Sequence, residues 1–289
     1  MISLGGVDLQ QGRYQRAAGQ FRPALDLARR AGSRGAEIRA LGNLALVDFH
    51  QGWYRRAGNY LEQALAACRQ VGDHPAEAHV LGCLGDVELR LGRYRQVAGY
   101  LERALAGCRQ AGDPLGKAHL LTSLGEADLR QGHVQQAGLY LRQSVAACQR
   151  NSDRTGEGYA HLGLGDSELT LGRPTEARRH YDRAMALFRE TGHQTGQAVV
   201  LNSLGAGALA AGRPAEARDQ RAAALGLARQ TGGQHQQARA REGLGDAHHA
   251  IGEIERAREY WHRAMEYYER AGVPEVGPLR NRLAAATAT

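Results

Sequence analysis

Glycine recurs every forty residues along almost the whole chain, and this period constrains the fold more than any other feature of the sequence. The first series of glycines consists of Gly12, Gly52, Gly92, Gly132, Gly172, Gly212 and Gly252. A second series, halfway between them, consists of Gly32, Gly72, Gly112, Gly192, Gly232 and Gly272, with Ser152 in the remaining place. A fixed period of this length indicates a tandem array of equivalent units, each packed mainly on its neighbours.

Two chain-breaking positions per period divide each unit into two segments of roughly seventeen residues, enough for two helices about 25 Å long. Within residues 118–129 the apolar side chains recur at steps of three and four residues, as an amphipathic helix requires. Pro174 and Pro214 follow breakers of the first series, where the first turn of a helix tolerates a missing N–H group. Aspartates that can cap the following helix come after the second series, at Asp73, Asp113 and Asp153. Each unit is therefore predicted to be a helix hairpin.

The expected fold class is all-α, because the alternation of β-branched residues that indicates strands is absent throughout the sequence. Aromatic residues make up only 6% of the chain, and alanine, leucine and glycine dominate, which suits closely packed helices. We expect a single solenoid over residues 1–289, with about seven helix-turn-helix repeats. The predicted units are a truncated first unit at 1–33, then 34–73, 74–113, 114–153, 154–193, 194–233 and 234–273, followed by a C-terminal capping segment at 274–289.

The first unit is shortened, because Met1 lies only three residues before the Leu4-Gly5 pair that marks the middle of a first helix. An open end of a repeat array exposes apolar surface, so native arrays usually begin with a complete or specialised cap. Two interpretations stay open, namely further protein upstream of Met1 or a frayed first helix. Formation of a homo-oligomer through an incompletely capped end of the solenoid is a related hypothesis.

The formal net charge is +7, and Lys117 is the only lysine, so almost all of the positive charge is arginine. A basic chain can bind nucleic acid or another acidic partner, whereas a preference for arginine over lysine also follows from a GC-rich genome. Many arginines fall at predicted helix ends, where a cation offsets the helix dipole and needs no partner. Nucleic-acid binding is therefore kept only as an alternative function.

Three cysteines, Cys68, Cys108 and Cys148, are spaced by the repeat period, and Cys83 stands alone. No CxxC motif is present, so the pattern favours small apolar core residues in a reducing compartment over a zinc or redox site. No apolar run is long enough to cross a bilayer, and no signal-peptide pattern precedes the first repeat. We expect a cytoplasmic protein that does not bind membranes.

Sequence motifs for catalysis are missing as well. The 12 histidines are scattered, no HExxH or GxxxxGK[ST] motif occurs, and no serine or cysteine lies in a nucleophile motif. His248 and His249 are adjacent on one predicted helix and therefore point to different faces. Short connections between the helices also leave few loops on which to build an active site. We expect neither an enzyme nor a cofactor or metal site.

Small residues recur at three positions of each unit, the eighth, twentieth and twenty-seventh when counted from the fifth residue of the unit (Ala78 in unit 74–113), a numbering kept below. At these positions two helices of a hairpin approach closely only if the side chains are small. They are Gly85, Val97 and Ala104, then Gly125, Ala137 and Ser144, then Gly165, Ala177 and Ala184, then Gly205, Ala217 and Ala224, and finally Gly245, Ala257 and Ala264. This pattern resembles the tetratricopeptide repeat (TPR) family over nearly the whole chain. The period is longer than the family's common form of about 34 residues, and the family's tryptophan and proline positions are not matched.

The pattern LGxxxLxxGxYxxAxxxxxxALxxxxxxGD looks like the 40-residue, long-helix subclass found in kinesin light chains and in large bacterial signal-transducing regulators. The abundance of arginine and alanine resembles the C-terminal TPR regions of actinobacterial antibiotic-regulatory-type transcriptional regulators, which are STAND-like. In that family a DNA-binding domain and a nucleotide-binding domain lie upstream of the repeats, and the present sequence contains neither.

The resemblance implies a right-handed α-α superhelix whose first helices line a concave groove and present defined positions to a protein or peptide ligand. Residues expected in this groove are His79, Asp86, Arg90, His119, Thr122, Glu126, Arg130, Tyr159, Asp166, Asn202 and Asp246. A chaperone-tail clamp is not expected, because acidic residues mostly hold the ninth position, where that clamp needs asparagine. The predicted function is a non-catalytic scaffold that binds a protein or peptide, as the sensory or regulatory region of a bacterial transcriptional regulator. An arginine-rich nucleic-acid-binding or self-associating protein is the alternative.

Charged groove residues four apart, Asp86 with Arg90 and Glu126 with Arg130, can form ion pairs along their own helices, each worth about 0.2–0.5 kcal/mol. Two interpretations stay open, namely a solvated face held by such pairs or a row of charges that meets a peptide.

Two units depart from the pattern. Arg221 stands where the other units have a large apolar residue, so we expect it to extend outward or to pair with an acid. A loose unit near residues 200–230 is predicted, as a hinge or docking point or through neutral drift. In the last unit, Trp261 is expected in the core, whereas Tyr267 and Tyr268 are candidates for an exposed patch.

Overall fold

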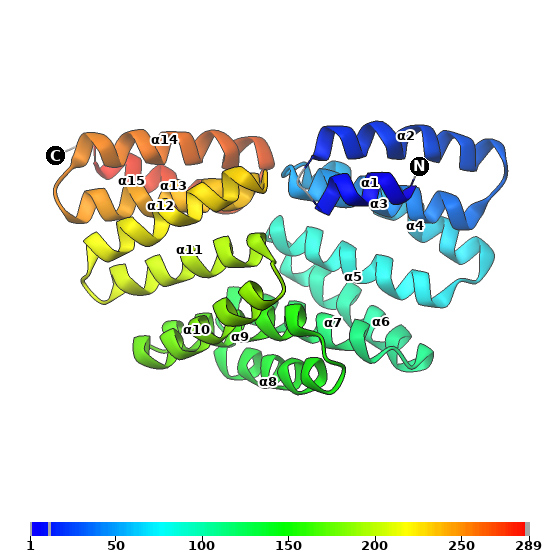
Figure 1. Cartoon of the computed structure of the whole chain (residues 1–289), viewed down its shortest axis with the longest axis horizontal. Coiled ribbons are helices and arrows are strands. Elements are labelled where there is room, and N and C mark those ends of the chain that lie inside the picture. Colours follow the sequence, from blue (N-terminus) through cyan, green and yellow to red (C-terminus); the bar gives the residue numbers. More distant parts are fainter. Residues whose placement is uncertain (1, 11–12, 287–289) are drawn as a thin grey trace. The chain divides into compact units, whose positions relative to one another are not determined.

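The computed structural model describes residues 2–10 and 13–286, and within them the chain consists of helices joined by short turns, without strands (Figure 1). The helices are α1 (Ile2–Gln10), α2 (Tyr14–Arg30), α3 (Arg34–His50), α4 (Tyr54–Val71), α5 (His74–Arg90), α6 (Tyr94–Ala111), α7 (Pro114–Arg130), α8 (Val134–Arg150), α9 (Arg154–Thr170), α10 (Pro174–Glu190), α11 (Gln194–Ala210), α12 (Pro214–Gln230), α13 (Gln234–Ala250), α14 (Ile254–Ala271) and α15 (Val276–Ala285). The all-α prediction is confirmed. Met1 and Gly12, on which two expectations rested, lie outside the described residues.

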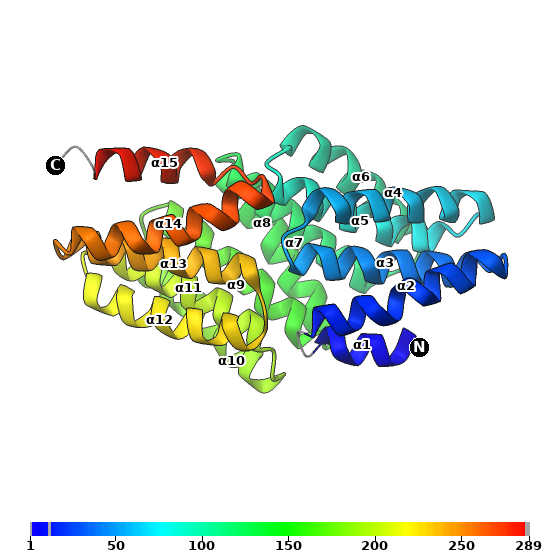
Figure 2. The same cartoon turned by 90° about the horizontal axis from the view of Figure 1, so that it is seen from above.

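Odd-numbered helices are the first helices of the predicted hairpins, and even-numbered helices are the second. The chain divides into two compact units, Met1–Ala127 and Asp128–Thr289, with the boundary inside α7. In the second compact unit, α12, α13 and α14 each contact the next helix along the chain (Figure 2). A single continuous solenoid over all repeats stays a prediction.

Glycine at the eighth position of a unit allows a large side chain of the second helix to pack directly on the first helix. A Cβ atom added at Gly85 would lie 2.5 Å from the side chain of Leu101. At Gly165 the same atom would lie 2.3 Å from Tyr181, which is only 1% exposed. The predicted close approach within the hairpins is therefore confirmed at these positions.

Helix ends also follow the predicted pattern. The carboxylates of Asp73, Asp113 and Asp153 accept hydrogen bonds from the backbone N–H three residues later, at 3.1, 2.9 and 2.9 Å. Pro174 and Pro214 begin α10 and α12. The thiols of Cys68, Cys108 and Cys148 are free and buried, as expected for core residues.

Ser152 adopts a left-handed backbone conformation with a φ of 56°, at the position where the neighbouring units have glycine. This conformation costs a residue with a side chain about 1–2 kcal/mol, and glycine's extra freedom in the unfolded chain offsets about 0.5–1 kcal/mol of that. We expect Ser152→Gly to raise the free energy of unfolding by about 0.5–1 kcal/mol in urea denaturation. Gly112→Ser, at the equivalent position with a φ of 63°, should lower it; a shift of the same sign for both variants would contradict this account.

Arg221 is buried with 8% exposure, so the expectation that it extends outward is wrong. Its Nη1 atom donates to the Asn202 Oδ1 atom at 3.3 Å and to the backbone oxygen of Arg239 at 3.2 Å. Within the described residues its hydrogen bonds go to these neutral oxygens, whereas the expected acidic partners, Asp246 and Glu242, act on its charge without a hydrogen bond. Space for the side chain exists because Gly205 and Gly243 face it, where added Cβ atoms would lie within 2.8 Å and 2.2 Å.

Burial of the Arg221 guanidinium, next to Arg239, lowers its pKa to about 10, so the charged form is held in an unfavourable environment. Leu141 packs on Gly163 in an equivalent way, which shows that leucine fits this slot. We expect Arg221→Leu to raise the free energy of unfolding by about 1–2 kcal/mol, because relief of desolvation outweighs the lost hydrogen bonds. Arg221→Ala should instead lower it by leaving a cavity. A less stable Arg221→Leu variant in denaturant titration would show that the hydrogen bonds dominate. Looseness near residues 200–230 stays a prediction for hydrogen exchange.

The aromatic residues of the last hairpin lie in its core. Trp261 is 2% exposed, as expected. Tyr267 and Tyr268 are 5% and 0% exposed, so the hypothesis that they form an exposed patch is wrong. The Tyr268 hydroxyl donates to the Glu242 carboxylate at 2.7 Å, and this contact holds its ring between α13 and α14.

Candidate functional site

The predicted groove residues of the first compact unit, Met1–Ala127, lie on α5 and α7. His79 and His119 are exposed, whereas Asp86, Arg90, Thr122 and Glu126 are partly buried. The Thr122 hydroxyl donates to the backbone of its own helix, at the oxygen of Ala118. These residues form what we call the first-helix face of this unit.

Part of the first-helix face is hollowed into a pocket of about 440 Å³ between α3 and α5. Of the predicted groove residues, the pocket brings together His79 and Asp86. Gly42 lies at an open part of the pocket, since a Cβ atom added there would meet no other atom within 4 Å. Apolar side chains, including Leu46 and Phe49, make up much of its wall.

Asp86 provides the acidic group of the pocket. Its carboxylate accepts a hydrogen bond from the Ser123 hydroxyl at 2.7 Å, and burial raises its pKa to about 6. Arg90 lies 3.1 Å from Glu126 on the following first helix. This ion pair connects two helices, and the charge of Arg90 also lowers the pKa of Asp86 on its own helix, as expected for a pair four residues apart.

In the second compact unit, Asp128–Thr289, most of the predicted groove residues contact other side chains of the same unit. Arg130 pairs with Glu275 at 3.4 Å. Asp166 accepts a hydrogen bond from the Tyr181 hydroxyl at 2.7 Å. The Tyr159 ring packs edge-on against Phe188, with centroids 4.9 Å apart.

Asn202 and Asp246 show the same engagement. The Asn202 side chain is 0% exposed and donates to the backbone oxygen of Gln236 at 3.2 Å, so its proposed ligand contact is corrected to a core position. Asp246 accepts from the Trp261 Nε1 atom at 3.0 Å and pairs with Arg282 of α15. Carboxylates at the ninth position therefore hold the hairpins together in this unit.

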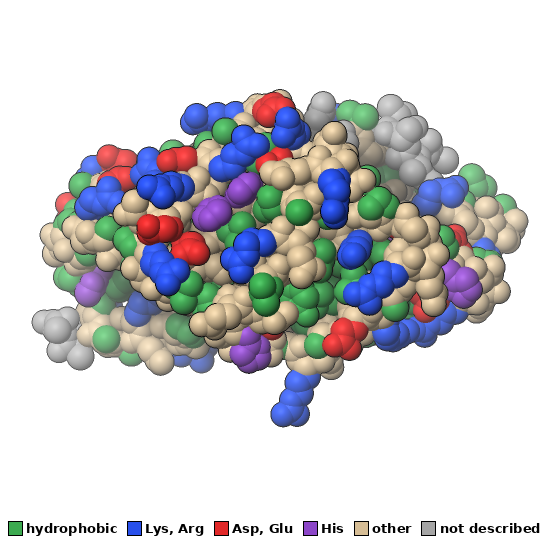
Figure 3. Space-filling view, turned by 90° about the horizontal axis from the view of Figure 1, so that it is seen from below, with side chains coloured by type: hydrophobic (Ala, Val, Ile, Leu, Met, Phe, Trp, Pro, Cys, Tyr) green, Lys and Arg blue, Asp and Glu red, His purple; other side chains and the backbone are tan. Residues whose placement is uncertain are grey.

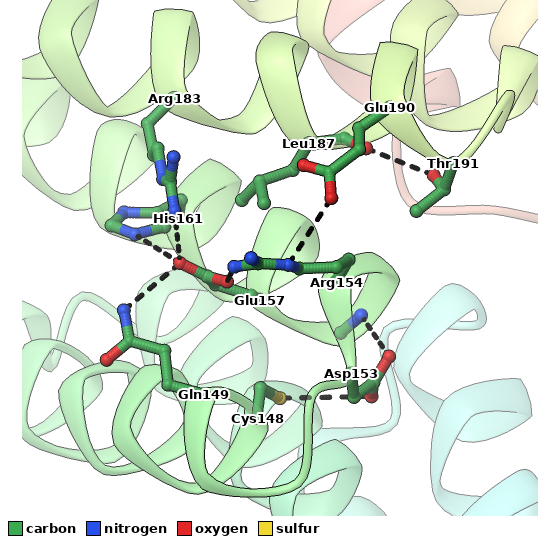
Figure 4. Close-up of polar contacts among 11 residues, drawn as sticks. Cys148, Gln149, Asp153, Arg154, Glu157, His161, Arg183, Leu187, Glu190 and Thr191 are labelled. Atoms are coloured by element: carbon green, nitrogen blue, oxygen red, sulfur yellow. Dashed lines mark hydrogen bonds and ion pairs between the residues drawn. The ribbon is translucent and has the colours of Figure 1, made fainter.

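A buried acidic residue, Glu157, lies in the second unit and was missed by the sequence analysis (Figure 4). Its carboxylate accepts hydrogen bonds from Gln149, Arg154 and Arg183, at 3.0, 3.2 and 2.9 Å. Burial alone would raise its pKa, but these hydrogen bonds outweigh that effect and lower it. His161 lies further away, with its Nε2 atom 3.9 Å from the carboxylate.

A repeat signal could have identified this cluster. Arg29 pairs with Glu37 and Arg69 pairs with Glu77, at 3.1 and 3.0 Å, and Glu157 belongs to the same series at intervals of forty and eighty residues. The contact ties each second helix to the next first helix. Because the contact recurs in several repeats, we interpret it as a structural contact between hairpins and not as part of a ligand site.

Two imidazoles meet between α9 and α10, where the Nδ1 atoms of His161 and His180 lie 3.1 Å apart. Burial and the neighbouring His180 lower the pKa of His161 to about 4. Within residues 2–10 and 13–286, no three His, Cys, Asp or Glu side chains meet as a metal site would require.

The surface charge and the lengths of the helices are relevant to two other kinds of partner, nucleic acid and membranes. On the face in Figure 3, basic side chains are scattered among acidic and apolar ones and do not gather into one block. In the part of the chain that the structure describes, every helix falls short of the length or apolar character needed to span a bilayer.

Gly42, Asn43 and Phe49 of the pocket were also missed by the sequence analysis. Gly42 occupies the fifth position of its unit, one of the positions that the family resemblance assigns to ligand contact. A glycine there could have indicated a hollow, but whether a neighbour fills it depends on the three-dimensional packing.

Solved structures with the same arrangement of helices are found at low sequence identity. The Rap conjugation gene regulator of the plasmid pLS20, in complex with the Phr* peptide, has a TM-score of 0.76 at 14% identity, covering 92% of this chain and 72% of that one. A Rap protein complexed with Competence and Sporulation Factor has a TM-score of 0.67 at 12% identity, covering 99% and 96%. A STAND protein with a tetratricopeptide repeat sensor from Pyrococcus horikoshii has a TM-score of 0.57 at 14% identity, covering 99% and 43%.

No curated protein matches the sequence. The tetratricopeptide repeat family model matches residues 1–70, 36–110, 116–190 and 156–230. These matches extend over most of the chain and agree with the helix hairpins of the structure. The chain therefore belongs to the tetratricopeptide repeat family.

Proposed function

We propose that this chain is a non-catalytic scaffold that binds a protein or peptide on the face formed by its first helices. The observation that carries this proposal is the open pocket between α3 and α5, which is lined by residues at the family's ligand positions. Pockets of a few hundred Å³ with apolar walls and a few polar groups are typical binding sites. Support also comes from the two similar Rap structures, which were solved with Phr* peptide and with Competence and Sporulation Factor.

The wider role that we propose is a sensory or regulatory repeat region of a bacterial transcriptional regulator of the actinobacterial type, acting in the cytoplasm. The long-helix subclass and the arginine-rich sequence motivate this part of the proposal. The similar STAND protein with a repeat sensor supports it at the level of the fold.

A pull-down with the immobilised full chain, from an actinobacterial lysate at native salt, tests the scaffold function. We expect an enriched protein or peptide whose capture falls at least fivefold with the double variant Asp86→Asn, Glu126→Gln. Asp166 is left unchanged, because its removal would leave the buried Tyr181 hydroxyl without its acceptor.

Enrichment of nucleic acid alone, with affinity that falls steeply with salt, would contradict the scaffold function and favour the alternative. Recovery of a small molecule alone would contradict it as well. Self-association through the ends of the array stays a prediction, which light scattering over a concentration series checks.

A further inference from the structure

The pocket between α3 and α5 has groups of opposite charge at its two ends. One hairpin partner, α4, separates α3 from α5, so these two first helices run in the same direction and equivalent positions lie side by side. Arg39 and His79 are equivalent positions near the helix starts, and both line the pocket. Asp86 lies seven residues further along α5, which corresponds to about 10 Å at a rise of roughly 1.5 Å per residue.

The polar groups of the pocket have capacity for further hydrogen bonds. Arg39 and Asn43 have no hydrogen-bond or ion-pair partner within the described residues, although both side chains line the pocket. An asparagine amide both donates and accepts, which matches the paired N–H and C=O groups of an extended peptide backbone. The Asp86 carboxylate accepts one hydrogen bond from Ser123 and keeps lone pairs for another donor.

Between the charged ends, the surface of the pocket is apolar. Leu46 is 42% exposed, although it lies beside Phe49 at the pocket wall. An exposed leucine in a hollow gains free energy when another apolar side chain covers it. Gly42 leaves the space for such a side chain, because no atom stands within 4 Å of its Cβ position.

The separation of the two ends along the helix axes sets the length of the occupant. An extended chain advances about 3.3–3.6 Å per residue, so roughly 10 Å corresponds to two residues separated by three steps. We propose that the pocket binds an extended four-residue segment of a peptide, with a cationic residue at Asp86, an acidic residue at Arg39 and apolar residues over Gly42. This inference rests on the proposed function and specifies its ligand.

Labelled, end-blocked peptides test this assignment by fluorescence anisotropy with the full chain. The probes contain Arg-Leu-Leu-Glu and Glu-Leu-Leu-Arg, since the chain can run in either direction, together with Gln-Leu-Leu-Gln and Arg-Ser-Ser-Glu. We expect one of the two charged leucine peptides to bind at least tenfold more tightly than the Gln and Ser versions. Equal binding of all probes, or binding of none, would overturn the proposal.

Substitutions locate the binding. Gly42→Leu adds a side chain at a point of the pocket where its Cβ meets no atom within 4 Å, so we expect affinity to fall at least tenfold while the melting temperature is not lowered. Gly99→Leu is the matched control, because it adds the same group to an exposed helix position with no atom within 4 Å, and it should bind normally. Asp86→Asn should abolish the preference for arginine over glutamine in the probe, and Arg39→Gln the preference for glutamate.

The outcomes separate this inference from the proposed function. If Gly42→Leu binds the probes as the natural chain does, the pocket assignment is wrong. If a partner is captured in the pull-down by both the natural chain and Gly42→Leu, the scaffold function stands without the pocket. If neither the lysate nor the probes yield a ligand, both proposals fail.

Discussion

Replacing Gly85 by leucine is expected to lower the free energy of unfolding by about 3 kcal/mol, the largest effect of any single substitution that we propose. The reason is steric, because a Cβ atom at this position would already lie 2.5 Å from Leu101. Leu101 is 0% exposed, so it can avoid the added group only by displacing other core side chains or leaving the core. Urea denaturation followed by far-ultraviolet circular dichroism measures the change.

Gly42→Ala is the control for this prediction, since it also adds a Cβ atom at a glycine in a first helix of the same compact unit, but in open space. No atom lies within 4 Å of the added Cβ, so only the helix propensity changes. The free energy of unfolding should rise by about 0.5–1 kcal/mol. If Gly85→Leu unfolds at the same urea concentration as the natural chain, the close packing of the hairpin does not control stability.

The second large effect is expected at Glu157, where replacement by alanine should lower the free energy of unfolding by about 2 kcal/mol at pH 7. The carboxylate is 0% exposed, and three side chains donate to it. Hydrogen bonds to a charged group contribute more than neutral ones, at about 1.5–3 kcal/mol. Arg154 and Arg183 are about half exposed and regain water when the acid is removed, which limits the loss.

The effect of Glu157 should depend on pH. Because its pKa is lowered in the folded chain from an ordinary value of 4.5, its charge stabilises the fold fully above pH 4.5. That contribution is lost as the pH falls through the lower folded value. The difference in stability between the natural chain and Glu157→Gln should therefore shrink in acid, as measured by urea titrations between pH 7 and pH 3.

Glu190→Ala is the matched control for the buried acid. Glu190 also pairs with Arg154, at 3.5 Å, but its side chain is 57% exposed. Exposed pairs contribute about 0–1 kcal/mol, so this variant should unfold almost like the natural chain. Equal losses for Glu157→Ala and Glu190→Ala would show that burial of Glu157 is not what makes its contacts strong.

The helix hairpins could be predicted from the sequence because their determinants are local and repeated. A glycine every twenty residues fixes the turns, and Asp73 caps its helix through a contact only three residues away. The small residue at Gly85 and the large one at Leu101 also lie within one hairpin. Each of these features occurs in several repeats, so the pattern can be recognised even where a single repeat departs from it, as at Ser152.

The details of the candidate site could not be predicted, because they depend on which side chains face one another. Asn202 and Tyr159 occupy ligand positions of the family, yet packing with neighbouring helices buries one and covers the other. Gly42 is indistinguishable in sequence from Gly82, but a Cβ at Gly82 would meet Leu120 at 2.9 Å. The burial of Arg221 could be predicted only by knowing that Gly205 and Gly243, the latter on the next hairpin, leave space for its side chain.

Arg221 also restricts the order in which the repeats can follow one another. Its side chain needs glycine at the sixth position of the following unit, which Gly243 provides. Of the corresponding positions in the other units after the truncated first one, only that of Gly163 is also glycine, and the rest are Asn43, Cys83, Ser123 and Ser203. Unit 194–233 therefore cannot be moved in front of those four units unless the Arg221 side chain shifts away. Although all the repeats have the same fold, they are therefore not interchangeable, and their order along the chain is restricted by side-chain contacts between neighbouring repeats.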